Sequence, residues 1–245
     1  MKSFGKIPDL LIAFAATIIL PRLSVQAANI VYPAINNIDP DKAFAWISIH
    51  HIALFLFTIV LMKLWPGNSL SSWGFNMNEY RLSLKISAWF CLAYLIPVFM
   101  FYSLPSLVSG TLPSFKYQIN AKNISGVLSF QLFLSGSCEE PLSRGFVMML
   151  LAQSWKKIYK LGKLEIPASG IWATLLFMFA HTGFNFKTLS FTSFSASQQI
   201  GIFLLGLYFA ILFHKTKSLF GPILSHGLAN GMVFVSLYIT YFVMG

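Results

Sequence analysis

Residues 129–155 read SFQLFLSGSCEEPLSRGFVMMLLAQSW, an apolar stretch long enough to cross a bilayer with two adjacent glutamates near its middle. Glu139 and Glu140 are two of only seven carboxylates in the chain, and the other five lie at the ends of apolar segments or between them. An ionised side chain at the centre of a membrane costs at least ~2.5–3.5 kcal/mol, so such residues face a protein interior or a water-filled cavity. The stretch therefore predicts a membrane helix whose paired acids have a task inside the protein.

The composition indicates an integral membrane protein. Of the 245 residues, 56% are hydrophobic and 10% are charged, whereas about a quarter of the residues in a soluble domain are charged. Apolar segments lie at 8–32, 44–64, 86–108, 126–154, 168–184, 197–214 and 218–243. Because about 20 apolar residues cross a bilayer as a helix, we expect an all-α polytopic membrane protein. The bundle would have seven transmembrane helices, or eight if one region contains a re-entrant piece.

The net charge of +10 comes from basic residues in the short stretches between apolar segments. If the N-terminus is inside, the inner stretches carry Lys2, Lys6, Lys63, Arg81, Lys85, Lys156, Lys157, Lys160, Lys163, Lys215 and Lys217. The outer stretches carry Lys42, Lys116, Lys122 and Lys187. Because cytoplasmic loops are enriched in lysine and arginine, the sequence predicts an N-terminus inside and a C-terminus outside. The lipid bilayer then accounts for the basic charge, and we expect no nucleic-acid partner.

The first apolar segment resembles a secretory signal, because it follows Lys2 and Lys6 and precedes the A-x-A-like sequence VQA at 25–27. Pro21 and Arg22 separate the apolar stretch from that site, so we expect the segment to be retained as the first helix. A compact multi-pass chain without a targeting extension fits the bacterial cytoplasmic membrane, which is the expected location.

The acidic pair has one evident partner in its own segment. Glu140 and Arg144 are four residues apart, so on a helix they share a face and can form an ion pair. Glu139 is rotated by about 100° from Glu140 and needs a partner from elsewhere. Alternatively, both glutamates pair with Arg144 and only fasten helices together.

Three more polar side chains lie inside late apolar segments, at depths compatible with the acidic pair. His181 occurs in FMFAHTGF, and His226 and Asn230 occur in SHGLANG. His226 and Asn230 are four residues apart and project from one helix face, as two hydrogen-bond donors to one small anion would. Gly227 and Gly231 form a small-xxx-small pair on an adjacent face, which predicts a close approach to a neighbouring helix.

The other three histidines lie at the ends of apolar segments. His50 and His51 open the second segment, and His214 closes the sixth beside two lysines. Amphipathic side chains at such positions reach the interface with their polar ends. We therefore expect these histidines at the membrane surface.

Together the polar residues form three motifs. They are E-E-x-x-x-R at Glu139, Glu140 and Arg144, F-x-x-x-H at Phe177 and His181, and H-x-x-x-N at His226 and Asn230. In this order, on successive late segments, they resemble the motifs of the CPBP family, which unites type II CAAX prenyl endopeptidases with bacterial Abi and bacteriocin-immunity proteins. The resemblance covers residues 125–245. It implies N-terminal transmembrane scaffold helices at 1–125 and a CPBP-like catalytic helix core at 126–245, within one membrane domain.

The resemblance also implies roles for the motif residues. Glu139 would be the general base that activates water, helped by His181. His226 and Asn230 would stabilise the oxyanion of the tetrahedral intermediate. Structural support of the site would come from Glu140 and Arg144. These roles describe a glutamate-dependent intramembrane endopeptidase.

Cofactor use follows less directly from the motifs. Glu139, His181 and His226 are a possible zinc ligand set with one open position. The chain has no H-E-x-x-H helix, and the resemblance is compatible with a metal-free reaction even though the family is often labelled as metalloproteases. We therefore expect no cofactor, and those three residues as the ligands if a divalent metal is bound.

Two other kinds of function remain open at this point. A non-catalytic immunity or regulatory protein would bind a peptide in the same cavity without cleaving it. A transporter would use the paired glutamates as ion carriers, although this leaves His226 and Asn230 unexplained. Under the endopeptidase hypothesis the partners are peptides or membrane proteins, of which the sequence specifies none.

Overall fold

The computed structural model describes residues 3–66, 69–185 and 188–245, so Lys2 and Lys187 lie outside the described residues. Within this part, five helical segments are long and apolar enough to cross a membrane. They are α1 with η1 (Lys6–Val31, Tyr32–Ala34), α2 (Ala45–Leu64), α3 with η3 and α4 (Tyr80–Val98, Phe99–Ser103, Leu104–Ser109), α9 (Ala196–Thr216) and α10 (Phe220–Met244). A short 3-10 helix, η2 (Leu70–Trp73), follows α2.

The stretch with the paired glutamates forms one further long helical segment, which we call the motif helix. It consists of α5 (Ala121–Ser129), η4 (Phe130–Ser135), α6 (Gly136–Glu140), η5 (Pro141–Met148) and α7 (Met149–Ser154), of which η4 and η5 are π-helical. Pro141 lacks an N–H group and cannot continue the α-helical hydrogen bonds, and π-helical turns begin there. π-helical turns are rare in proteins, and many of those that occur lie at functional sites.

The fifth apolar segment, 168–184, contains the shorter helix α8 (Ala168–Ala180). Helices thus occupy all seven predicted apolar segments, and the all-α polytopic fold is confirmed. Helix α8 ends at Ala180, short of the predicted end at 184, because residues 183–185 pair as a strand.

Two antiparallel hairpins, which the sequence did not predict, flank α8. They pair β1 (Ile158–Leu161) with β2 (Leu164–Pro167) and β3 (Gly183–Asn185) with β4 (Ser190–Ser193). In the first hairpin the two residues between the strands begin with Gly162, whose φ of 59° suits a tight hairpin turn.

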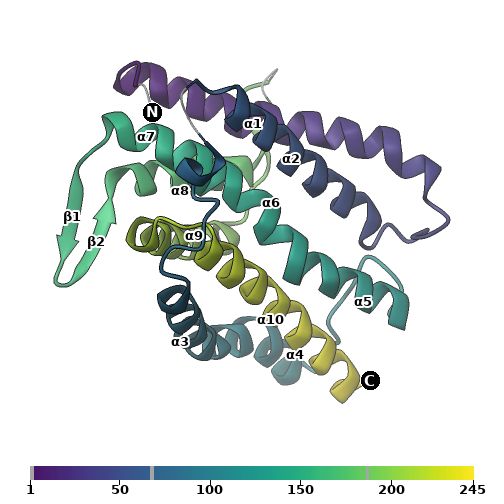
Figure 1. Ribbon diagram of the computed structural model, residues 1–245. Coiled ribbons are helices and arrows are strands. Elements are labelled where there is room, and N and C mark those ends of the chain that lie inside the picture. The colour runs from purple at the N-terminus through teal and green to yellow at the C-terminus, as the bar shows by residue number, and fades with distance from the viewer. Residues whose placement is uncertain (1–2, 67–68, 186–187) are drawn as a thin grey trace.

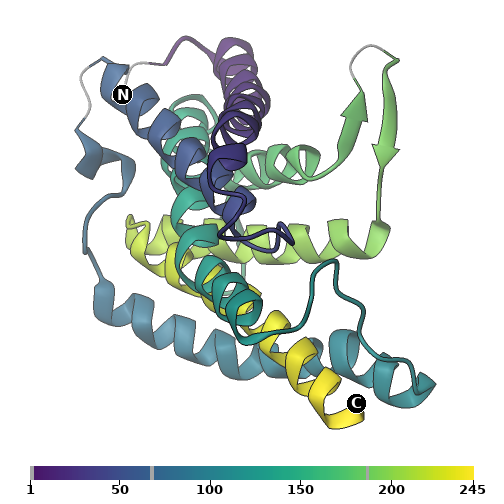
Figure 2. The ribbon, with the colours of Figure 1, turned by 90° about the vertical axis from the view of Figure 1, so that its right-hand side faces the viewer.

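The motif helix lies at the centre of the bundle. In Figure 1 it runs between the pair α1 and α2 above and α10 below, and Figure 2 shows α3 on the far side of α10. Every residue of η5 is buried, and Phe146, Leu150 and Leu151 belong to the main hydrophobic core. The outer helices expose large apolar side chains, such as Leu11 and Leu92. Lipid covers such side chains in a membrane protein, so the exposed apolar surface fits a bilayer.

The connections gather at two ends of the bundle. At one end Lys6 lies over the Trp155 ring, 5.4 Å from its centroid, and the Leu219 N–H donates to the Gly74 carbonyl at 2.9 Å. At the other end Asp41 accepts a hydrogen bond from Asn123 at 2.6 Å. The termini lie at opposite ends (Figure 1), and the number of membrane crossings, seven or eight, stays a prediction. Which end faces the cytoplasm stays a prediction.

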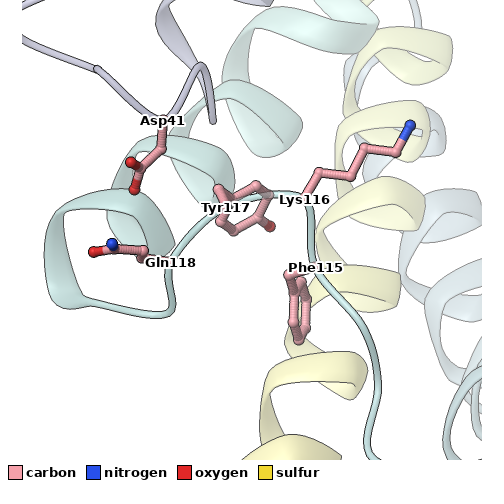
Figure 3. Close-up of a pocket in the computed structure, with 5 residues that line it drawn as sticks. All are labelled: Asp41, Phe115, Lys116, Tyr117 and Gln118. Carbon is pink, nitrogen blue, oxygen red and sulfur yellow. The ribbon is translucent and has the colours of Figure 1, made fainter.

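The second end carries a surface pocket of about 330 Å³. Figure 3 shows its five lining residues, Asp41, Phe115, Lys116, Tyr117 and Gln118, which come from the loops before α2 and α5. No residue of the three motifs lines this pocket.

The glycine pair of α10 permits the predicted close approach. A Cβ atom at Gly227 would overlap the backbone carbonyl oxygen of Leu132 in η4, and one at Gly231 would overlap the Leu132 side chain. A backbone atom cannot move aside as a leucine side chain can. The two glycines therefore hold α10 against the motif helix, and Gly227 tolerates the least change.

We expect Gly227→Ala to lower the free energy of unfolding by about 1–3 kcal/mol, because the added methyl group forces two helices apart. Gly231→Ala should cost less, since Leu132 can change rotamer. Gly201→Ala, on α9 where nothing lies within 4 Å of the added atom, is the control and should be neutral or slightly stabilising. Unfolding in detergent measures all three, and equal stability of the Gly227 and Gly201 variants would contradict the prediction.

Candidate active site

The predicted ion pair between Glu140 and Arg144 is present and fully buried. Arg144 Nη1 lies 3.2 Å from Glu140 Oε1, and both side chains have 0% exposure. Arg144 Nη2 also donates to the Gly206 carbonyl of α9 at 2.8 Å. The guanidinium lies 5.1 and 5.6 Å from the ring centroids of Phe177 and Phe209. Arg144 thus connects the motif helix to α8 and α9, and it is a fully buried counter-charge of Glu140.

His226 joins the buried pair from α10. Its Nδ1 lies 2.7 Å from Glu140 Oε1, and because a carboxylate only accepts hydrogen bonds, Nδ1 is the donor. The ring stacks on Phe209 with 5.1 Å between centroids. These contacts fix the ring orientation, so that Nε2 faces Glu139, 3.7 Å from Oε2. Glu140 therefore orients the histidine that faces the other glutamate.

His226 and Asn230 lie on one face of α10 and both approach one oxygen atom of the protein, whereas their role as oxyanion donors stays a prediction. Asn230 Nδ2 donates to Ser135 Oγ at 2.8 Å, and His226 Nε2 lies 3.5 Å from the same atom. Ser135 was missed by sequence reasoning. The available signal was its position four residues before Glu139 on the motif helix, which places both on one face. The Ser135 hydroxyl marks the point at which the two nitrogens can bind an oxygen atom.

Glu139 has a partner that the sequence did not predict. His51 Nε2 lies 2.9 Å from Glu139 Oε1, and the residue is only 5% exposed. The expectation that His51 lies at the membrane surface is therefore wrong. Helix α2 begins at Ala45, so His51 lies about 9 Å along its axis, where the side chain is enclosed by neighbouring helices. The sequence did contain a signal for this position, because His51 lies seven residues after the predicted start of its apolar segment at 44.

His181 lies at the C-terminal end of α8, directly after Ala180. Its Nδ1 contacts the Phe177 carbonyl at 2.9 Å, and the two rings lie 4.3 Å apart. His181, like His51 and His226, is close enough to the Glu139 carboxylate for an electrostatic interaction. The ring of Phe177 also contacts Arg144. The F-x-x-x-H motif thus packs against the buried ion pair and places its histidine near Glu139.

The two glutamates differ in access. The Glu139 side chain is 17% exposed, whereas that of Glu140 is 0% exposed. Only Glu139 can therefore meet a water molecule or a substrate in this conformation. Its Oε2 lies 3.7 Å from His226 Nε2, which lies 3.5 Å from Ser135 Oγ, so a potential base and potential oxyanion donors are neighbours. Such an arrangement can activate water and stabilise a developing negative charge.

The described residues contain no group of three or more His, Cys, Asp or Glu side chains placed to hold a metal ion. Glu139 instead directs its two oxygens at different histidines, with Oε1 toward His51 and Oε2 toward His226. Metal dependence is not decided by this arrangement and stays a prediction.

Comparison with known proteins gives one match. Residues 122–232 match the family model of type II CAAX prenyl endopeptidase, Rce1-like. No curated protein and no solved structure matches the chain. The matched region runs from α5 into α10 and includes all three motifs.

Proposed function

The chain belongs, through residues 122–232, to the Rce1-like family of type II CAAX prenyl endopeptidases, and on this premise we propose that it is an intramembrane endopeptidase with Glu139 as its general base. The match confirms the CPBP membership that the motifs predicted. One observation carries the proposal beyond family membership. Glu139 Oε2 lies 3.7 Å from His226 Nε2, so the partly exposed carboxylate is a neighbour of the potential oxyanion donors.

The proposed reaction begins with water bound to Glu139. Its oxygen attacks the peptide carbonyl carbon while Glu139 takes one proton, and the carbonyl electron pair moves onto its oxygen. Once the Ser135 side chain has turned to another rotamer, Asn230 Nδ2 and a protonated His226 Nε2, which now lie 2.8 and 3.5 Å from its hydroxyl oxygen, stabilise the former carbonyl oxygen. When the intermediate collapses, the carbon–nitrogen bond breaks and the leaving amine receives the proton from Glu139. No metal ion takes part in this proposal, and His181, directly after α8, is proposed to assist Glu139.

A groove of about 450 Å³ offers the substrate an approach. Its lining residues come from α2 and the motif helix, and they are Phe44, Ser48, Lys122, Ser125, Gly126, Ser129, Phe130, Phe133 and Leu134. The ring of Phe130, one of these lining residues, packs on His51 with 4.7 Å between centroids, and His51 contacts Glu139. We propose that an extended apolar peptide segment lies in this groove.

We expect Ser129→Trp to lower kcat/KM by about 10-fold or more for peptides that extend along the groove. The indole would fill the space in which the peptide makes apolar contacts, and the loss of such contacts costs about 1–3 kcal/mol. Ala121→Trp is the matched control, since this exposed residue on the same helix does not line the groove. Steady-state cleavage assays compare the two variants. Equal activity of both would remove the groove from the proposal.

The proposed activity itself is tested by profiling the N-terminal ends of peptides in membranes from a host that lacks this protein. Wild-type protein and equally abundant Glu139→Gln protein are expressed in turn. New peptide ends that arise only with the wild type support an endopeptidase and identify its substrates. If the profiles are identical and Glu139→Gln rescues the deletion phenotype, a non-catalytic protein that binds a peptide in the same cavity is the correct function.

A further inference from the structure

Counter-charges are distributed unequally between the two glutamates. Glu140 has Arg144 and His226 within 3.2 Å. The shortest contact of Glu139 among the described residues is with His51, at 2.9 Å, from a helix outside the matched family region. Glu139 and His51 lie 88 positions apart in sequence, so only the packing of α2 on α6 brings them together.

The His51 ring is held on three sides. Its Nδ1 lies 2.9 Å from the Ile47 carbonyl oxygen, and its faces and edges meet the rings of Phe130 and His50 at 4.7 and 5.0 Å. Because a carbonyl oxygen only accepts, Nδ1 must be the donor in that bond. Nε2 is therefore the one nitrogen left for Glu139, and the packed ring cannot turn away without losing these contacts.

This orientation requires a proton between the two residues. Nε2 of a histidine protonated only at Nδ1 is an acceptor, and a carboxylate oxygen is an acceptor as well. Two acceptors at 2.9 Å repel each other, so one proton must lie between Nε2 and Oε1. A charged bond of this kind is shorter and about twice as strong as a neutral one. It anchors one carboxylate oxygen and leaves the other directed at His226.

We propose that His51 is a positioning residue for the general base: it donates from Nε2 to Glu139 Oε1 and thereby aims Oε2 at the reaction space. This inference rests on the proposed function, because it assigns a role at the same base. It assigns His50, the neighbouring histidine, no such role. His50 Nδ1 bonds instead to Ser24 Oγ of α1 at 3.0 Å.

The activity test compares three variants in a cleavage assay on a peptide identified by profiling. His51→Ala should lower kcat by about 10–100-fold, as loss of an orienting partner does, with KM nearly unchanged. Added imidazole should restore part of the kcat of His51→Ala, and His51→Gln should retain more activity than His51→Ala because its amide nitrogen still donates. His214→Gln is the control, because the His214 ring lies against Lys217 and Glu165 rather than against Glu139 or His51, and it should behave as wild type. Full activity of His51→Ala, or a loss that neither imidazole nor glutamine relieves, would overturn the proposal.

A second measurement does not depend on cleavage. Nitrogen NMR of protein labelled in histidine should show one residue protonated at both ring nitrogens that disappears in His51→Gln and shifts in Glu139→Gln. The positioning role would be refuted if His51 Nε2 carried no proton and its nitrogen chemical shift were the same in wild type and Glu139→Gln. If this signature is present while no peptide is cleaved by the wild type, the His51 contact stands and the proposed function fails.

Discussion

Glu139→Gln is expected to lower kcat/KM for the cleaved peptide by about 10²–10⁴-fold, the usual contribution of a general base. Glutamine has nearly the same shape but cannot take a proton from water. Its amide oxygen can still accept the hydrogen bond from His51, so the helices should remain packed as in the wild type. Cleavage kinetics of the purified protein, with unfolding measured in parallel, test the expectation.

The control for this substitution lies one residue away. Cys138 is buried, with 3% exposure, and its thiol would be the alternative nucleophile. Cys138→Ala should retain wild-type kcat/KM, because the proposed reaction uses water. An inactive Cys138→Ala protein together with an active Glu139→Gln protein would reverse the two assignments.

Arg144→Met is expected to lower the free energy of unfolding by about 3–5 kcal/mol, the range for removal of one partner from a buried ion pair. The substitution leaves Glu140 without its guanidinium in a fully buried position. It also removes the donor to the Gly206 carbonyl and the contacts with two aromatic rings. Reversible unfolding in mixed detergent measures the loss.

A double variant separates charge from packing at this pair. In Glu140→Gln with Arg144→Met, the buried negative charge is gone and a neutral side chain still accepts from His226. We therefore expect the double variant to recover much of the stability lost in Arg144→Met, since apolar replacement of a whole buried pair is often neutral or stabilising. Additive losses from the two substitutions would contradict this account.

Much of the fold followed from local sequence patterns. Apolar segments of sufficient length must form helices in a bilayer because no water is present to satisfy the backbone, and helices occupy all seven predicted segments. The spacing of Glu140 and Arg144 predicted their ion pair, because residues four apart on a helix are neighbours. The same rule predicted that His226 and Asn230 share a target.

The hairpins and the end of α8 were not predictable in this way. Strands β3 and β4 pair with each other, and the pairing ends the helix at Ala180 just before His181. The apolar run continues past that point, so hydropathy alone placed the end too late. The antiparallel pairing of β3 with β4 therefore determined where α8 ends, although the apolar composition of the segment favoured a longer helix.

The sequence by itself determined which residues carry the motifs and which helices they occupy, because hydropathy and helical spacing act over a few residues. Only the tertiary structure decided the partners of Glu139. Two π-helical segments flank α6 and change the direction in which its residues point, and a residue of α2, 88 positions away, meets the carboxylate. The rotation of one packed helix against another depends on all the side chains between them. Local patterns could therefore mark His51 and Ser135 as candidates, but they could not show which side chains these two residues contact.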